Sequence, residues 1–315
     1  MVNREKIATI FGGTGFLGKQ IVKELANRGI TVKVATRIPE SAYFLKPCGE
    51  IGQIVPVQCN YSDPCSVRNA VKGSDFVVNC IGILFEKRKH SKFARAHIDI
   101  PAMIAKACSD EDVQRFVHIS ALGCDKSTSK YAKTKLEGES AILTNYPNAT
   151  ILRPSVIFGE DDKFFNMFAE MARFTPFLPL IGGGNTKFQP IYVGDVSEVT
   201  LKALTSNDDK YLGKIYQLGG PEIVTFKEIY EKLFKYTGRK RKLVNIPYWV
   251  AKIEACFLSF LPKPPLTRDQ VESLKSDNIV SDGALDIQLY GIKPKSLDLI
   301  LPKYLKHYKS GGHLA

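Results

Sequence analysis

Short apolar runs alternate with segments of helical periodicity through residue 220 of the chain. Seven of these runs are too short for helices and rich in β-branched or aromatic residues, which predicts buried strands. The predicted strands are Ile7–Phe11, Thr31–Thr36, Ile54–Gln58, Phe76–Cys80, Arg115–Ser120, Thr150–Leu152 and Ile215–Leu218. Between them, apolar residues recur every three or four positions, as over 15–28 and 101–108. This alternation predicts an α/β fold in which helices are wound on both faces of a parallel sheet.

The pattern is less regular after residue 155, and helices dominate from Thr225 onward. We expect a helix over Phe164–Phe174, a loop over Pro176–Pro179 and a strand over Phe188–Val193. The predicted organisation is a Rossmann domain formed by residues 1–155 and 187–220, with a smaller, mainly helical lobe formed by 156–186 and 221–315.

One predicted helix of the smaller lobe, Pro247–Leu261, has a nearly continuous apolar side. The residues that share this side are Trp249, Ile253, Cys256, Phe257 and Phe260. A side packed on the protein core is the favoured interpretation. The alternative is contact with a membrane surface, because a run of basic residues precedes the helix.

Three glycines, Gly12, Gly15 and Gly18, follow the first strand at a spacing of three and open a helix. Glycines at this turn let the backbone approach a pyrophosphate, and the helix N-terminus faces the phosphates with its partial positive charge. The segment therefore predicts a dinucleotide site. The residues predicted to contact the nucleotide here are Gly12, Thr14, Gly15, Phe16, Leu17 and Gly18.

Arg37 directly follows the second strand, where an acidic residue would bind the ribose of NAD and an arginine accommodates the phosphate of NADP. We therefore expect NADP(H) as the bound nucleotide. NAD(H) is the alternative, if Arg37 is only a surface residue at the end of the strand and does not contact the nucleotide. Other predicted contacts follow later strands, because ligands bind at the carboxyl ends of parallel strands. They are Asn60, Tyr61, Ile81, Gly82 and Pro154.

Tyr131 and Lys135 are four residues apart and project from one side of a helix that follows the fifth strand. A lysine in this position can bind a ribose and lower the pKa of a nearby phenol, which suits proton donation to a carbonyl. Ser120, which ends the fifth strand, is the third candidate for catalysis.

Composition limits the other possibilities. The 44% hydrophobic and 24% charged residues are ordinary for a globular protein. The seven cysteines and five histidines show no ligand spacing, so no metal site is expected. A net charge of +12 is concentrated at 86–95, 238–242 and 303–309. No nucleic-acid recognition motif accompanies it, so a membrane surface or an acidic protein is the expected partner. The alternative is a solvated surface charge that binds no partner.

The glycine motif, the Tyr131/Lys135 pair and Leu152–Gly159 resemble the short-chain dehydrogenase/reductase superfamily, in its extended and atypical branches. Four further segments resemble a family of accessory subunits of respiratory complex I (the NADH:ubiquinone oxidoreductase) and the bacterial homologues of these subunits. The segments are 188–196, 218–222, 266–278 and 301–305. This resemblance implies an NADPH that is held at Gly12, Gly15, Gly18 and Arg37 and that supports structure. It also implies that the lobe after Thr225 faces the membrane arm or the quinone region of complex I.

Two features of the sequence depart from the superfamily pattern. Ala121 and Leu122 stand where a catalytic serine is usual, and Asn60 stands where an aspartate commonly contacts adenine. The leading interpretation is an accessory or assembly subunit of the oxidoreductase, peripheral on the inner face of the membrane, on the matrix side in a mitochondrion. The alternatives are an active NADP-dependent oxidoreductase or sugar-nucleotide epimerase that uses Tyr131 and Lys135, and a ubiquinone-biosynthesis protein. Whether a small-molecule substrate exists is left open.

Overall fold

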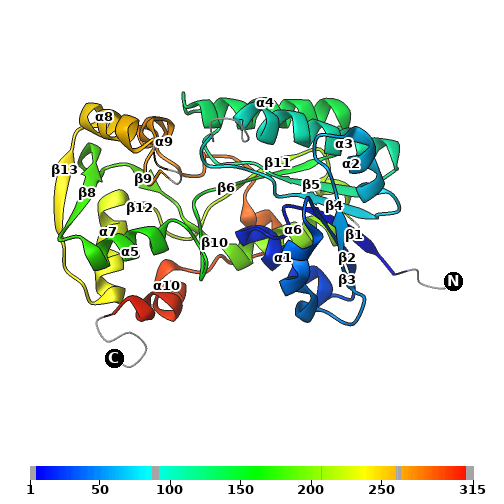
Figure 1. The fold of residues 1–315 in the computed structure, drawn as a ribbon, viewed down its shortest axis with the longest axis horizontal. Coiled ribbons are helices and arrows are strands. Elements are labelled where there is room, and N and C mark those ends of the chain that lie inside the picture. Colours follow the sequence, from blue (N-terminus) through cyan, green and yellow to red (C-terminus); the bar gives the residue numbers. More distant parts are fainter. Residues whose placement is uncertain (1–4, 87–91, 207, 260, 262–263, 310–315) are drawn as a thin grey trace.

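The computed structural model describes residues 5–86, 92–206, 208–259, 261 and 264–309. Within these residues, the centre is a parallel sheet of seven strands in the order β11-β6-β5-β4-β1-β2-β3 (Figure 1). The strands are β1 (Ile7–Phe11), β2 (Thr31–Thr36), β3 (Ile54–Gln58), β4 (Phe76–Asn79), β5 (Arg115–Ile119), β6 (Thr150–Pro154) and β11 (Ile215–Leu218). The strand order reverses between β1 and β4, as in a Rossmann fold, which confirms the predicted doubly wound sheet.

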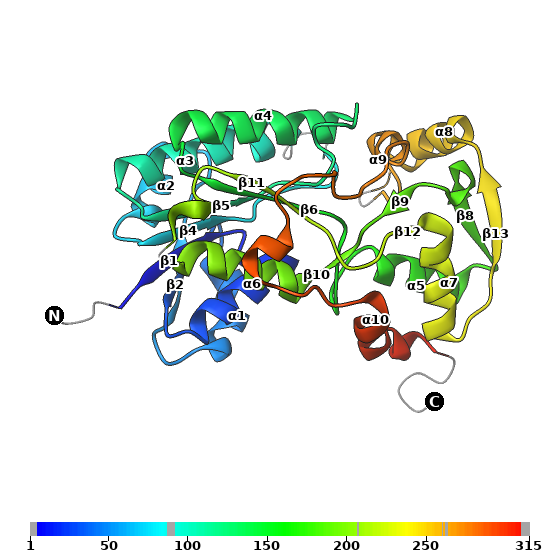
Figure 2. The ribbon, with the colours of Figure 1, turned by 180° about the vertical axis from the view of Figure 1, so that it is seen from behind.

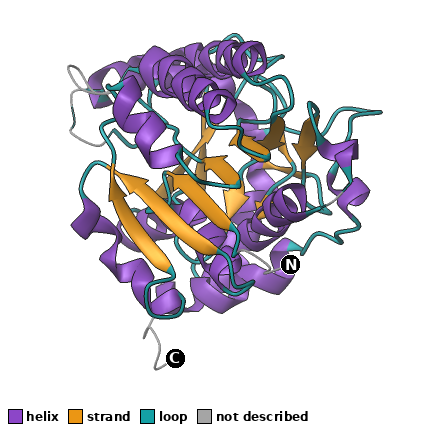
Figure 3. Cartoon of the chain, turned by 90° about the vertical axis from the view of Figure 1, so that its right-hand side faces the viewer, coloured by secondary structure: helices purple, strands orange, loops and turns teal. Residues whose placement is uncertain are grey.

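Helices cover both faces of this sheet (Figure 3). One face carries α1 (Phe16–Ala26) and α6 (Val193–Thr205), whose apolar sides form one core cluster with the strands. The other face carries α2 (Pro64–Val71), α3 (Ile100–Asp110) and α4 (Lys130–Asn145) over a second cluster. A π-helical turn, η2 (Arg95–Asp99), leads into α3. Short 3₁₀ segments complete the connections: η1 (Pro39–Cys48), η3 (Gly182–Gly184), η4 (Asp209–Tyr211), η5 (Ile287–Tyr290) and η6 (Lys306–Tyr308).

We call the remaining helices, with β8 and β13, the smaller lobe. Figures 1 and 2 show it at the end of the molecule opposite β1, β2 and β3. Its core is rich in aromatic residues, which come mainly from α5 (Phe165–Phe174), α7 (Phe226–Thr237) and α10 (Leu297–Leu305). Its outer edge is formed by β8 (Phe177–Ile181), β13 (Lys242–Ile246) and α8 (Tyr248–Leu258), and α9 (Arg268–Ser273) lies between α8 and α4.

Two local predictions for this region are wrong. Residues 177–179 of the loop expected over 176–179 belong to strand β8, which pairs in parallel with β13 and buries Leu178 and Leu180 in the lobe core. The strand expected over 188–193 is split by Pro190, which has no backbone N–H to donate. Its two parts are β9 (Lys187–Phe188), paired with β12 (Val224–Thr225), and β10 (Ile191–Tyr192), paired with β7 (Ile157–Phe158).

The favoured interpretation of the apolar helix before residue 261 is also wrong. In α8, the side chains of Trp249, Ile253 and Phe257 are 67%, 51% and 70% exposed. The side packed on the lobe is formed by the small residues Ala251 and Ala255. Phe260 and residues 87–91 of the predicted basic segment at 86–95 lie outside the described residues. In the part of the chain that the structure describes, no helix has the length and hydrophobicity needed to cross a membrane.

Candidate functional site

The residues predicted to hold a nucleotide lie along the carboxyl edge of the parallel sheet. Gly12 follows β1, Arg37 follows β2, and Asn60 and Tyr61 follow β3. Ile81 and Gly82 follow β4, Ser120 follows β5, and Pro154 is the last residue of β6. The parallel topology therefore brings segments far apart in the sequence to one edge, as expected for a ligand crevice.

The turn between β1 and α1 has backbone geometry that only glycine accommodates easily. Gly12 has a φ of +77°, and a Cβ on it would lie 3.0 Å from the carbonyl carbon of Cys80. A Cβ on Gly18 would lie 2.1 Å from the Gly12 carbonyl oxygen. Gly15 is the residue before α1 and has no side chain to cap the helix. The turn is therefore shaped for close approach of a phosphate, and the residues present fit a dinucleotide.

Arg37 and Tyr61 form the far end of this crevice. The exposed guanidinium of Arg37 lies 6.0 Å from the centre of the Tyr61 ring. The Tyr61 hydroxyl donates a hydrogen bond to the Ala35 carbonyl at 2.7 Å, which fixes the ring. Asn60 is exposed, and its side-chain oxygen accepts from the backbone of Ser62. The arrangement offers a cation beside an aromatic ring at the end of β2 and β3.

Tyr131 and Lys135 lie in the first turns of α4. The helix begins after Ser129, whose hydroxyl accepts from the Ala132 backbone N–H at 3.1 Å. Lys135 is only 3% exposed, and its Nζ donates to the Ile119 carbonyl at 3.0 Å. A Cβ on Gly82 would lie 3.5 Å from this Nζ, so the lysine reaches the loop after β4. The sheet edge and α4 therefore meet at Lys135.

Burial changes the proton affinity of both residues. It lowers the pKa of Lys135 from 10.5 to about 8, although the nearby acidic groups of Glu139, Cys124 and Cys80 oppose this effect. Burial raises the pKa of the Tyr131 phenol, and Cys124 and Asp269 raise it further. Tyr131 therefore keeps its proton at neutral pH.

Ser120 lies in a buried polar cluster together with Glu139. Its hydroxyl donates to Glu139 Oε1 in a short hydrogen bond, and Cys124 Sγ lies 3.4 Å from the same oxygen. Arg153 binds Glu139 through Nε and Nη2, the latter at 2.7 Å, and Asp125 through Nη1 at 2.6 Å. The hydroxyl of Ser120 is therefore engaged in a structural network, rather than free beside Tyr131.

His97, which the sequence analysis did not single out, packs between α4 and the loop after β4. The Ile83 backbone N–H donates to its Nε2 at 3.2 Å, and its Nδ1 lies 3.0 Å from the Thr134 hydroxyl. The rings of His97 and Tyr131 meet edge to face at 5.2 Å. Burial and the charge of Lys135 lower the pKa of His97 to about 3, so the imidazole is neutral. It positions Tyr131 and the Ile83 loop.

The smaller lobe contributes Asp269 to the start of α4. Its carboxylate accepts from the Lys130 backbone N–H at 2.7 Å and from the Tyr131 backbone N–H at 3.0 Å. Negative charge at a helix N-terminus is stabilising, because it complements the helix dipole and the unpaired N–H groups. The helix that carries Tyr131 is thus capped by a residue from α9.

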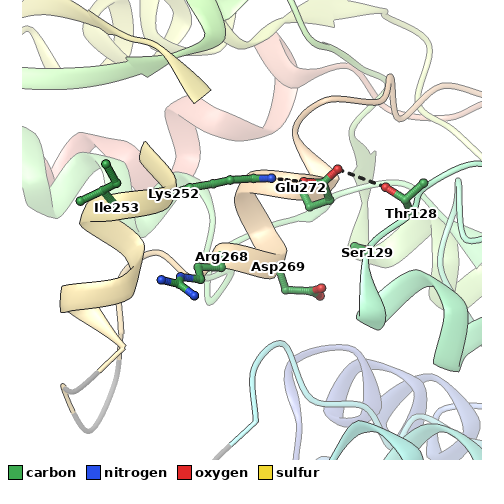
Figure 4. Close-up of a pocket in the computed structure, with 7 residues that line it drawn as sticks. All are labelled: Thr128, Ser129, Lys252, Ile253, Arg268, Asp269 and Glu272. Carbon is green, nitrogen blue, oxygen red and sulfur yellow. Dashed lines mark hydrogen bonds and ion pairs between the residues drawn. The ribbon is translucent and has the colours of Figure 1, made fainter. Parts of the chain in front are cut away.

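A pocket of about 560 Å³ lies where α8 and α9 meet the start of α4 (Figure 4). It is lined by Thr128, Ser129, Lys252, Ile253, Arg268, Asp269 and Glu272. Glu272 joins its two sides, because it accepts from the Thr128 hydroxyl at 3.1 Å and forms an ion pair with Lys252 at 2.7 Å. The pocket is therefore crossed by bonds between the lobe and α4.

Asn278 makes a second connection to the sheet edge. Its Nδ2 donates to the Leu122 carbonyl at 2.8 Å, and its Oδ1 accepts from the Ser155 hydroxyl at 2.6 Å. Asp269 and Asn278 both belong to segment 266–278, which the sequence analysis used only as a mark of resemblance. The sequence did contain a local indication that Glu139 belongs to the site, because it follows Lys135 by one helical turn on the same side of the helix. Among the described residues, no group of His, Cys, Asp and Glu could hold a metal ion.

The Rossmann sheet, the glycine turn and the Tyr131/Lys135 helix define a dinucleotide-binding protein of the short-chain dehydrogenase type. Residues 8–219 match the family model described as "NAD dependent epimerase/dehydratase family", and the chain belongs to this family.

Comparison with individual proteins of known name is more informative than the family model. The chain is 35% identical over 318 residues to the protein "NADH dehydrogenase (ubiquinone) 1 alpha subcomplex subunit 9, mitochondrial" of Arabidopsis thaliana, with 97% of this chain and 79% of the relative covered. It is 32% identical to the protein of the same name from Rattus norvegicus, over 96% of this chain and 81% of the relative. It is 30% identical to the "NADH-ubiquinone oxidoreductase 40 kDa subunit, mitochondrial" of Neurospora crassa, over 97% and 80%.

Solved structures agree on the fold. A triphenylmethane reductase from Citrobacter sp. superposes with a TM-score of 0.77 at 19% identity, over 96% of this chain and 99% of the other. An NADPH-dependent quinone oxidoreductase from Escherichia coli, complexed with NADPH, gives 0.74 at 19% identity, over 95% and 99%. At this identity the likeness concerns the fold alone.

Proposed function

We propose that this protein is an accessory subunit of a respiratory NADH:quinone oxidoreductase that retains a nucleotide as part of its structure. The observation that carries the proposal is the identity of 30–35% to mitochondrial subunits of such oxidoreductases over nearly the whole chain. The matched length includes α8, α9 and the segment 266–278, outside the part that matches the family model. From the role of an accessory subunit we also infer where the protein is located. It would be peripheral on the inner face of the membrane, which is the matrix side in a mitochondrion.

The chemistry around Tyr131 supports retention of the nucleotide over rapid turnover. Ala121 and Leu122, at the positions where the superfamily has its serine, carry no hydroxyl. The Ser120 hydroxyl is committed to Glu139. A bound NADPH supplies a hydride donor, but reduction of a carbonyl also needs hydrogen-bond donors that stabilise the developing oxyanion. Tyr131 alone is a poor substitute, since its raised pKa makes it a weak acid.

We further propose that the nucleotide is NADP(H). Arg37 is the exposed cation at the end of β2, in the position where Rossmann proteins select between the two nucleotides. Arg37→Asp should therefore shift the bound nucleotide from NADP(H) toward NAD(H). Arg28→Asp, an equally exposed change on the same domain, should leave it unchanged.

The test is to purify the protein without added nucleotide, denature it and identify what is released by mass spectrometry. One NADPH per chain that neither exchanges nor becomes oxidised on a panel of carbonyl compounds and quinones supports a structural role. An empty protein, or a nucleotide that turns over and stops doing so in Tyr131→Phe, would instead support an active oxidoreductase. Co-sedimentation with the assembled oxidoreductase in gentle extracts tests the association separately.

A further inference from the structure

The chain that follows α9 crosses from the smaller lobe to the carboxyl edge of the sheet (Figure 2). We call residues 275–286 of this chain the strap. Apolar cores anchor it on both sides, since Val271 before it and Ile287 after it are 0% and 3% exposed. No residue of the strap itself is buried. The strap is therefore held to the sheet mainly by hydrogen bonds, and it can lift without opening a core.

Asn278 is the main attachment of the strap to the sheet edge. Its Nδ2 donates to the Leu122 carbonyl at 2.8 Å, and its Oδ1 accepts from the Ser155 hydroxyl at 2.6 Å. Its backbone N–H donates to the Lys187 carbonyl at 2.8 Å, and its carbonyl accepts from the Gln189 N–H at 3.0 Å. Leu122 follows β5 and Ser155 follows β6, so one side chain ties the strap to the ends of two neighbouring strands.

The second half of the strap continues along the same edge to β11. The Val280 N–H donates to Gln189 Oε1 at 2.9 Å, and the Ser281 N–H donates to Gln217 Oε1 at 2.8 Å. The backbone N–H of Gln217, in β11, donates to the Leu285 carbonyl at 2.8 Å. Each of these bonds joins the strap to another segment, so all of them break together when the strap lifts.

The strap lies on the same side of the crevice as Tyr131 and Lys135. Lys135 binds the last residue of β5, and Asn278 binds the loop that follows it. A dinucleotide in a Rossmann fold spans the point where the strand order reverses, here between β1 and β4. With Arg37 after β2 at the adenosine end, the nicotinamide end extends over β4 and β5. On the proposed function, the strap therefore borders the reactive end of the nucleotide.

The strap also binds the backbone at the position of a missing catalytic group. Leu122 is one of the two positions where a serine is usual in the superfamily, and its carbonyl is bound by Asn278. Just before the strap, Asp269 accepts from the Tyr131 backbone N–H. One continuous segment of the chain therefore bounds this side of the site from α4 to β11.

We propose that the strap shuts the substrate side of the crevice and that Asn278 is the residue that keeps it shut. This proposal rests on the proposed function and deepens it, because it accounts for a nucleotide that is held beside Tyr131 without turnover. Hydride transfer needs donor and acceptor atoms about 3–3.5 Å apart. While the strap lies on the ends of β5 and β6, a carbonyl compound cannot come that close from this side. When the strap lifts, the crevice opens to substrate and water.

The first test measures access to the bound nucleotide without any turnover. Protein saturated with NADPH is titrated with acrylamide, a small neutral compound that quenches the fluorescence of the reduced nicotinamide. In the wild type the quenching should be several-fold weaker than for free NADPH. Asn278→Ala removes the bonds to Leu122 and Ser155 and should raise the quenching several-fold at an unchanged NADPH content. Asn148→Ala, an exposed change before β6, should leave the quenching as in the wild type.

The second test is amide hydrogen exchange, and its main result comes from the wild type alone. The N–H groups of Asn278, Val280 and Ser281 should exchange much more slowly than those of the exposed residues Asp282 and Gly283, because their partners lie outside the strap. In Asn278→Ala, the amides of Val280 and Ser281 should exchange at least about tenfold faster, since two hydrogen bonds that oppose lifting are lost.

Three results would overturn this proposal. They are wild-type NADPH that is quenched as readily as free NADPH, fast exchange of the three strap amides in the wild type, and equal quenching in Asn278→Ala and Asn148→Ala. None of them changes the amount of NADPH per chain or the co-sedimentation with the oxidoreductase, so the proposed function would still stand. A wild type that cannot be saturated with NADPH would instead overturn the nucleotide part of the proposed function and this proposal with it.

Discussion

Substitution of the buried Lys135 should make the nucleotide-free protein more stable while weakening its hold on the nucleotide. Burial lowers the pKa of Lys135 from 10.5 to about 8. At about 1.4 kcal/mol per pKa unit, the charged lysine destabilises the folded protein by about 3 kcal/mol below pH 8. The hydrogen bond from Nζ to the Ile119 carbonyl stabilises the folded protein by about 1–2 kcal/mol and offsets part of this cost. Lys135→Met removes both effects, so we expect a net gain of about 1–2 kcal/mol near neutral pH.

The pH dependence of the free energy of unfolding tests independently whether the charged Lys135 destabilises the folded protein. Between about pH 8 and 10.5, Lys135 is protonated in the unfolded chain and neutral in the folded one. The unfolded state then binds more protons, so the free energy of unfolding rises with pH across this window. Below pH 8 both states hold the proton and the full destabilisation is present. The wild type should therefore gain stability from pH 8 to 10.5 relative to Lys135→Met.

The assay is urea unfolding of nucleotide-free protein at several pH values, with the two proteins compared at each pH so that other titrating groups cancel. Lys133→Met, an exposed change on the same helix, should track the wild type throughout. Equal pH dependence of wild type and Lys135→Met, or a loss of more than about 1 kcal/mol in Lys135→Met near pH 7, would refute the argument that burial of the charge is destabilising. NADPH retention should fall in Lys135→Met alone.

Three further substitutions test the contacts that hold α4. Glu139→Gln leaves Arg153 without its buried charged partner and should lower the free energy of unfolding by about 3–5 kcal/mol, measured with urea. Gly138→Ala places a Cβ 1.8 Å from the His97 carbonyl oxygen and should cost about 1–3 kcal/mol, seen as a lower thermal midpoint. Asp269→Ala removes the carboxylate that accepts from the first two N–H groups of the helix and should cost about 0.5–2 kcal/mol, with faster release of bound nucleotide.

Exposed neighbours provide the controls for these three changes. Glu137→Gln and Glu137→Ala lie on the outer side of α4, and Asp282→Ala lies in an exposed turn. Each should change stability by less than about 0.5 kcal/mol. If Glu139→Gln is as mild as Glu137→Gln, the buried pair is not a structural contact of consequence. If Asp269→Ala releases nucleotide no faster than Asp282→Ala, the lobe does not support the nucleotide site through α4.

The sheet could be predicted from the sequence because its signals are local. Each of the seven strands is a short run rich in strand-forming residues, and the glycine turn after β1 fixes the topology to a familiar type. Once the strands are known to be parallel, their carboxyl ends must share an edge. The positions of Gly12, Arg37, Gly82 and Pro154 along one crevice therefore follow from the pattern alone.

What could not be predicted depends on distant contacts or on irregular backbone. Strand β8 has a weak local signal and exists because it pairs with β13, far along the chain. Asp269 caps a helix whose first residues are 138 positions away. His97 lies in the π-helical turn η2, where the extra residue per turn disrupts the helical period. Trp249 was expected to be buried because apolar periodicity does not distinguish a protein core from another apolar environment.

These contacts join the two parts of the molecule into a single support for α4. The lobe holds its first turn through Asp269, and the sheet holds Lys135 through the Ile119 carbonyl. One turn later, Glu139 is fixed by Arg153 at the end of β6. These bonds act on successive turns of one helix, so displacement of Tyr131 would break several at once. This support is consistent with the proposal that the nucleotide stays bound, because Tyr131 and Lys135 are held in place from both the lobe and the sheet edge.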